Sequence, residues 1–137
     1  MNDVIREQVL AANRGFYDAL ESLDMVAMEA CWSSDTEVAC LHPGGAWHRG
    51  WDEVGSGLEA IMANTGYIVF EIAGAEVTLV DPLAWVTCIE RITSAAGEGG
   101  PAVAEVAATN LFVLDAQGWR MALHHASPII RMMGEEE

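Results

Sequence analysis

The most informative segment of the sequence is Asn110–Pro128, which reads NLFVLDAQGWRMALHHASP. Two apolar runs flank the turn Asp115–Gly118, and this pattern predicts a β-hairpin. Alternation along the second run would place Trp119, Met121, Leu123, His125 and Ser127 on one face, and Arg120, Ala122, His124 and Ala126 on the other. A Trp at the start and a His-x-Ser at the end of one face are unusual for a purely structural strand. We therefore expect a sheet that curls around a pocket with polar groups at its tip.

The elements before this hairpin follow from a change in apolar period along the chain. Helical spacing predicts a helix over 3–22, capped by Asn2 or Asp3, with Val9, Phe16 and Leu20 on its apolar side and Asn13 facing solvent. It also predicts a short helix that follows the cap Asp24 and ends near Cys31-Trp32, and a helix over about 52–62. A short strand is predicted at 37–41, and β-rich segments at roughly 67–80, 83–94, 101–114 and 118–128. Helices followed by a meander of long strands predict an α+β fold, with a cavity between the helices and a curved sheet.

Length, charge and cysteine content limit the possible functions. The 137 residues predict one domain over 1–132 and an acidic flexible tail over 133–137. A net charge of −15 argues against nucleic-acid and anionic-membrane partners, because both require clustered basic residues. Three widely spaced cysteines without a CxxC, no signal-peptide pattern and no long apolar run favour a reduced, cytoplasmic protein. The hydrophobic content of 52% is rich for a monomer and favours burial of some surface against a second copy.

Two motifs carry a resemblance to a known family. The first is Leu41-His42-Pro43-Gly44-Gly45 with Gly50, and the second is Thr109-Asn110 followed by Trp119 and by His124-His125-Ala126-Ser127-Pro128. Taken together with the order of segments, they resemble the SnoaL-like branch of the nuclear-transport-factor-2-like (NTF2-like) superfamily, over nearly the whole chain. One departure is Leu123, which stands where a further His is often found.

The resemblance implies a cone-shaped α+β barrel related in fold to ketosteroid isomerase. It also implies a homodimer formed through the sheet, with a pocket at the open end. Relatives on this scaffold include isomerases, dehydratases and cyclases as well as modules that only bind or oligomerise, so the fold does not settle the function.

Three residues are candidates for catalysis. His125 is suited to proton transfer near neutral pH, although a core His bonded to Ser127 or Asn110 is the alternative. Glu90 shares a predicted strand face with apolar residues, which would favour its protonated form; pairing with an arginine or simple exposure is the alternative. Asn110 would polarise a ligand carbonyl or, equally, satisfy backbone groups at a bulge.

A further set of residues is predicted to contact the ligand, mostly because aromatic walls suit a ring-shaped compound. These residues are Tyr17, His42, Trp47, Trp85, Phe112 and Trp119. Core or dimer-interface positions are the alternative for the aromatic residues, and a structural turn for His42. The sequence has no HxxxH, HExxH or nucleotide-binding motif, so we expect neither a metal nor a cofactor.

The sequence therefore favours a small-molecule-binding protein with an apolar pocket. One hypothesis is a cofactor-free isomerase, dehydratase or cyclase that acts on a hydrophobic carbonyl compound by general acid–base catalysis. The other is a non-catalytic dimerising or ligand-sensing module, favoured by Leu123. An open cavity on which Glu90 and Asn110 converge would favour the enzyme, and a cavity filled by Met121, Phe70 and Phe112 would favour the module.

Overall fold

The computed structural model describes residues 2–95 and 100–130, so the predicted tail at 133–137 lies outside the described residues. Its helices are α1 (Asp3–Ser22), α2 (Met25–Cys31) and α3 (Gly50–Ala63). Its strands are β1 (Ala39–Leu41), β2 (His48–Arg49), β3 (Tyr67–Val80), β4 (Leu83–Ala95), β5 (Ala102–Asp115) and β6 (Gly118–Pro128). The predicted helices and long strands are confirmed to within a few residues.

Side-chain caps determine where the first two helices begin. The Asn2 side chain accepts hydrogen bonds from the backbone N–H groups of Val4 and Ile5, and the Asp24 carboxylate accepts those of Val26 and Ala27. These bonds satisfy donors that a helix start otherwise leaves without partners. Both caps lie where the sequence predicts them.

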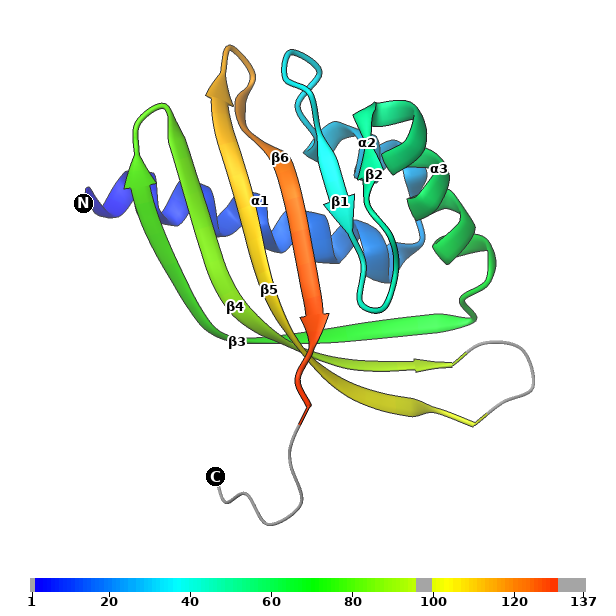
Figure 1. Ribbon diagram of the computed structural model, residues 1–137. Coiled ribbons are helices and arrows are strands. Elements are labelled where there is room, and N and C mark those ends of the chain that lie inside the picture. The colour runs from blue at the N-terminus through cyan, green and yellow to red at the C-terminus, as the bar shows by residue number, and fades with distance from the viewer. Residues whose placement is uncertain (1, 96–99, 131–137) are drawn as a thin grey trace.

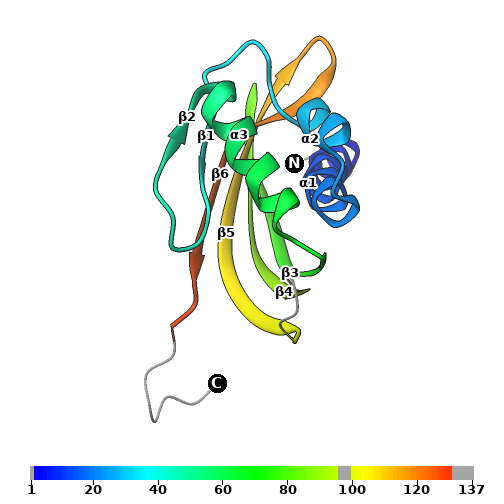
Figure 2. The same cartoon turned by 90° about the vertical axis from the view of Figure 1, so that its right-hand side faces the viewer.

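In the described ranges, the strands form one sheet in the order β2-β1-β6-β5-β4-β3. Neighbouring strands are antiparallel except β1 and β6, which are parallel, and the two edge strands do not pair with each other. The sheet is therefore strongly curved but open rather than closed into a barrel. Figure 1 shows α1 crossing one face of the sheet, and Figure 2 shows α1, α2 and α3 on that same side. The core lies between these helices and the inner face.

Two β-bulges shape the sheet. In β3 the pairing with β4 shifts between Ala73 and Glu76, where Gly74 adopts a positive φ of 62°. In β6 the pairing with β5 shifts: Leu111 pairs with Leu123, but the next residue, Phe112, pairs with Met121. Ala122 is therefore left as an extra residue in β6. A bulge bends its strand and increases the local twist.

The bulge in β6 corrects the predicted assignment of its faces. Trp119 and Met121 point inward as alternation predicts, but beyond Ala122 the inward residues are His124 and Ala126. His125 and Ser127 are exposed on the outer face. The prediction that His125 shares a face with Trp119 is therefore wrong, because one extra residue reverses the alternation after it.

A second correction concerns α1. Its apolar stripe contains Val9, Phe16, Tyr17 and Leu20, as the periodicity predicts in part, but Asn13 lies on the same buried side. Asn13, predicted to face solvent, is only 3% exposed. No helix among the described residues is both long and apolar enough to cross a membrane.

Candidate active site

A cavity of about 450 Å³ lies between the helices and the inner face of the sheet. Most of its wall is apolar, formed by Leu20, Ile61, Ile68, Phe70, Ile92 and Val106. Polar side chains interrupt the wall at His42, Thr65, Glu90, Ser94 and His124. An apolar space with a few polar groups is the usual composition of a site for a small hydrophobic ligand.

Glu90 is the ionisable group most strongly affected by this cavity. Strand β4 directs it inward between Cys88 and Ile92, and only 2% of its surface is exposed. Burial raises the pKa of the Glu90 carboxyl to about 7, and the hydrogen bond from Tyr17 lowers it in part. The Tyr17 hydroxyl donates to Glu90 Oε2 at 2.6 Å. Both protonation states of Glu90 are therefore populated near neutral pH.

Behind Glu90, a chain of hydrogen bonds links α1 to β5 and β6. The Asn110 amide nitrogen Nδ2 donates to Asn13 Oδ1 at 2.8 Å and to the Tyr17 hydroxyl at 3.0 Å. Asn110 Oδ1 lies 2.6 Å from His124 Nδ1. Asn110 has no exposed surface, and all its polar side-chain atoms are bound within the protein.

His124 completes this buried group. Its Nε2 atom lies 3.9 Å from Glu90 Oε2, and its ring packs against Phe16 at a centroid distance of 4.7 Å. Burial, followed by the nearby His42 and His125, lowers the pKa of His124 to about 3. The ring is therefore neutral wherever Glu90 titrates.

His42 lies on the cavity wall after β1, and its contact with a ligand stays a prediction. Its ring is 5.8 Å from that of His124, and its Nε2 is 3.3 Å from the Cys40 thiol. Burial and the nearby His48 lower the pKa of His42 to about 4. His42 is thus a second neutral imidazole beside the cavity at physiological pH.

The other predicted site residues are divided among four places. Tyr17 lies directly behind Glu90, whereas Phe112 and Trp119 are buried among core residues, at 1% and 8% exposure. Trp85 lies on the outer side of β4, between the inward-pointing Ala84 and Val86. Trp47 is 41% exposed in the loop between β1 and β2, where its ring lies 5.4 Å from that of His125.

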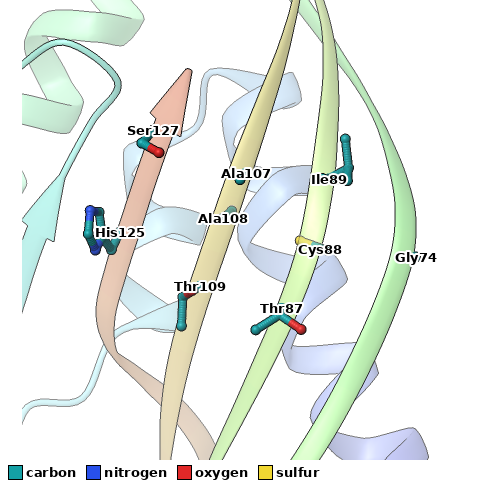
Figure 3. A pocket seen from close by; sticks show the side chains of 9 residues that line it. All are labelled: Gly74, Thr87, Cys88, Ile89, Ala107, Ala108, Thr109, His125 and Ser127. Atoms are coloured by element: carbon teal, nitrogen blue, oxygen red, sulfur yellow. The ribbon is translucent and has the colours of Figure 1, made fainter. Parts of the chain in front are cut away.

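His125 itself belongs to the outer face of the sheet. Figure 3 shows it with Thr87, Thr109 and Ser127 on strands that have the helices behind them. These four residues help to line a hollow of about 390 Å³. The sheet therefore separates His125 from Glu90 and from the inner cavity. Met121 and Phe112 fill the core rather than the cavity, which remains open, with Glu90 on its wall but Asn110 behind it.

Sequence reasoning missed His124 and Asn13 as members of the site. For Asn13 a signal exists, because it stands four residues after Val9 and three before Phe16 on the apolar stripe of α1. For His124 no local signal exists, because its orientation depends on the bulge. Within the described residues, no group of three potential ligands is positioned to hold a metal ion, and the cysteines are free thiols.

Comparison with solved structures gives the same architecture. The chain is 34% identical to a Streptomyces avermitilis protein assigned as a dehydratase of the NTF2-like family, with a TM-score of 0.90 over 96% of this chain and 100% of that one. It is 29% identical to a Thiobacillus denitrificans protein assigned as a calcium/calmodulin-dependent protein kinase type II association domain, with a TM-score of 0.73 over 88% and 94% of the two chains.

Sequence comparison adds a curated relative and a family. The chain is 23% identical over 122 residues to the F-box protein SKIP8 of Arabidopsis thaliana, matching 89% of this chain and spanning half the length of that relative. Residues 9–131 match the family described as the SnoaL-like domain. That match covers every helix and strand described above except the first turns of α1. With its α+β fold of NTF2-like type, the chain belongs to the SnoaL-like domain family.

Proposed function

We propose that the protein binds a hydrophobic small molecule in the inner cavity and acts on it by cofactor-independent general acid–base catalysis. The substrate class is a hydrophobic carbonyl compound, and the reaction an isomerisation, dehydration or cyclisation. The observation that carries this proposal is Glu90, a carboxyl with a pKa of about 7 on the wall of an apolar cavity. Such a group is poised to take up and return a proton near neutral pH.

The surroundings of Glu90 give each neighbour a role. Ionised Glu90 removes a proton from the carbon beside the carbonyl, and protonated Glu90 returns it to a second position of the same molecule. Tyr17 holds the carboxyl in place through its 2.6 Å hydrogen bond. The apolar wall excludes water, which strengthens the interactions that develop during proton transfer.

Two predicted catalytic residues do not contact the substrate in this proposal. Asn110 was expected to polarise the carbonyl, but both its amide nitrogen and its oxygen are bound to protein groups behind the cavity. His125 lies on the outer face of the sheet. Asn110 instead positions Tyr17, and through it Glu90.

The test measures proton transfer directly. Beta-tetralone, a hydrophobic cyclic ketone, is incubated with the protein in deuterium oxide, and exchange of its α-hydrogens is followed by proton NMR. The wild-type protein should accelerate exchange over buffer, and Glu90→Gln should lower that acceleration by about a hundredfold or more. Glu59→Gln, at an exposed position of α3, is the matched control and should behave as wild type. Equal exchange by wild type and Glu90→Gln would contradict the proposal.

A second candidate function is a non-catalytic dimerising or ligand-sensing module. The similarity to the protein assigned as a kinase association domain, at 29% identity, favours it. The outer hollow around Thr87 and Thr109 supplies a surface for such a role. Saturable binding of beta-tetralone without any Glu90-dependent exchange would favour this candidate over the enzyme.

A further inference from the structure

We infer that the buried end of the cavity recognises a hydroxyl group, so that the carbonyl ligand is a hydrophobic hydroxyketone whose O–H donates to His124 Nε2. This inference deepens the proposed function and rests on it for the identity of the site. It follows from the direction of each hydrogen bond behind the cavity.

The first step is the orientation of the Asn110 amide. Its nitrogen has two hydrogens, and the structure pairs that nitrogen with Asn13 Oδ1 and with the Tyr17 hydroxyl. The amide oxygen, Oδ1, is consequently the atom that faces His124 Nδ1 at 2.6 Å. Asn13 therefore fixes which end of Asn110 meets the histidine.

The second step is the position of the proton on His124. An amide oxygen only accepts hydrogen bonds, so His124 Nδ1 must carry the hydrogen and donate it. A neutral imidazole has one N–H, which leaves a lone pair on Nε2. The burial of the side chain, which is only 3% exposed, favours this neutral state.

The third step is the surroundings of Nε2. The Tyr17 hydroxyl has one hydrogen, and it is directed to Glu90 Oε2. The separation of 3.9 Å between Nε2 and Glu90 Oε2 is too long for a hydrogen bond. Among the described residues, no fully buried polar side-chain atom lacks a partner. No described residue donates a hydrogen bond to Nε2, and so this atom borders the cavity that His124 lines.

The result is a pair of acceptors, His124 Nε2 and the Glu90 carboxylate, at one end of an apolar space. A ligand hydroxyl donates to Nε2 and, when Glu90 is protonated, also accepts from the carboxyl. A carbonyl oxygen can only accept the hydrogen bond from protonated Glu90. Its lone pairs would also face the lone pair of His124 Nε2, which is repulsive. The site therefore favours an alcohol over a ketone of the same shape.

Borneol and camphor test this preference, because they share one rigid carbon skeleton and differ as alcohol and ketone. Their dissociation constants are measured by NMR titration at neutral pH. Borneol should bind several-fold to about tenfold more tightly, as one additional hydrogen bond implies. In Glu90→Gln the difference should shrink, because the amide N–H competes for Nε2 and can donate to a ketone. Glu59→Gln should retain the wild-type ratio.

Nitrogen NMR of labelled protein tests the tautomer independently of any ligand. His124 should show a protonated Nδ1 and an unprotonated Nε2. A proton on Nε2, or camphor that binds as tightly as borneol, would overturn the inference while leaving acid–base catalysis by Glu90 intact. Failure of both borneol and camphor to bind would contradict the proposed function instead, because that function requires the cavity to bind hydrophobic small molecules.

Discussion

At the scale of single residues, the site depends on one carboxyl group in an apolar environment. Glu90 lies among buried side chains and accepts a hydrogen bond from the Tyr17 hydroxyl. Its cost of ionisation in this environment is what raises its pKa from an ordinary value of 4.5 to about 7. The same burial that suits Glu90 for proton transfer therefore makes the folded state sensitive to pH.

Replacement of Glu90 by Gln should remove one component of that sensitivity. Because the pKa is higher in the folded state, folded protein retains a proton that unfolded protein releases as pH rises. The contribution of Glu90 to the free energy of unfolding should therefore fall by about 3 kcal/mol between about pH 4.5 and pH 7. Urea denaturation of both proteins at about pH 5 and about pH 8 measures this change.

The comparison with Glu90→Gln is needed because the buried histidines change the free energy of unfolding in the opposite direction as pH rises. The pKa of His42 is lowered from 6.5 to about 4, so its contribution to stability rises over that pH range. The histidine contribution is common to both proteins and cancels in their difference. If the difference in free energy of unfolding between the wild type and Glu90→Gln does not change with pH, the pKa of Glu90 is not raised.

At the scale of elements, two bulges give the sheet its curvature. Gly74 lies in the bulge of β3 with a φ of 62°, a conformation that costs about 1–2 kcal/mol for a residue with a Cβ atom. A Cβ at this position would meet no atom within 4 Å, so any cost of substitution comes from the backbone alone.

Alanine substitutions at two glycines should therefore have opposite effects. Gly74→Ala should lower the free energy of unfolding by about 1–2 kcal/mol. Gly15→Ala, in the middle of α1 and also without an atom within 4 Å of the added Cβ, should raise it by up to about 1 kcal/mol. Thermal and urea unfolding of the two variants are the measurement. Equal effects would contradict the role assigned to the β3 bulge.

Deletion of Ala122 tests the bulge in β6. Removal of this extra residue restores strict alternation and leaves Trp119, Met121 and His124 on the inner face, as they are now. The variant should therefore fold, with near-native circular dichroism. Deletion of Ala108, from a regular part of β5, should prevent folding because every later residue of that strand would change faces. Comparable behaviour of the two deletions would contradict the register.

At the scale of the whole molecule, we propose that the outer face of the sheet binds a second copy of this chain. The hollow in Figure 3 is lined by small or neutral residues, without a lysine, arginine or carboxylate among them. A surface of this kind is unusual on a chain with a net charge of −15. Depletion of charge is characteristic of the centre of an interface.

A charge at the centre of this face should dissociate the dimer. Thr109→Glu should give a monomer in sedimentation equilibrium, whereas Thr36→Glu, exposed in the segment after α2, should leave the dimer intact. Because both copies are strongly acidic, association of the wild type should tighten as salt rises from low concentration. A wild-type protein that remains monomeric at all concentrations and salt levels would contradict this proposal.

Local structure and the kind of fold could be predicted from the amino-acid sequence. Helical spacing with the caps Asn2 and Asp24 marks α1 and α2, and long β-rich runs between turns mark β3 to β6. These signals are read within a single segment, because caps and periodicity depend on neighbours in the chain. The position of Glu90 on an inward face of β4 was also predictable, since that strand alternates without interruption between Leu83 and Ile92.

Which polar residues contact one another depends on the packing of distant segments and could not be predicted from the sequence. His124 points inward and His125 outward because pairing of β6 with β5 leaves Ala122 as an extra residue, and such a register is a property of two strands together. In the same way, Asn13 joins Asn110 only once α1 lies against the sheet, at a sequence separation of 97 residues. The chain alone thus indicates a pocket, whereas packing between distant segments determines the chemistry on its wall.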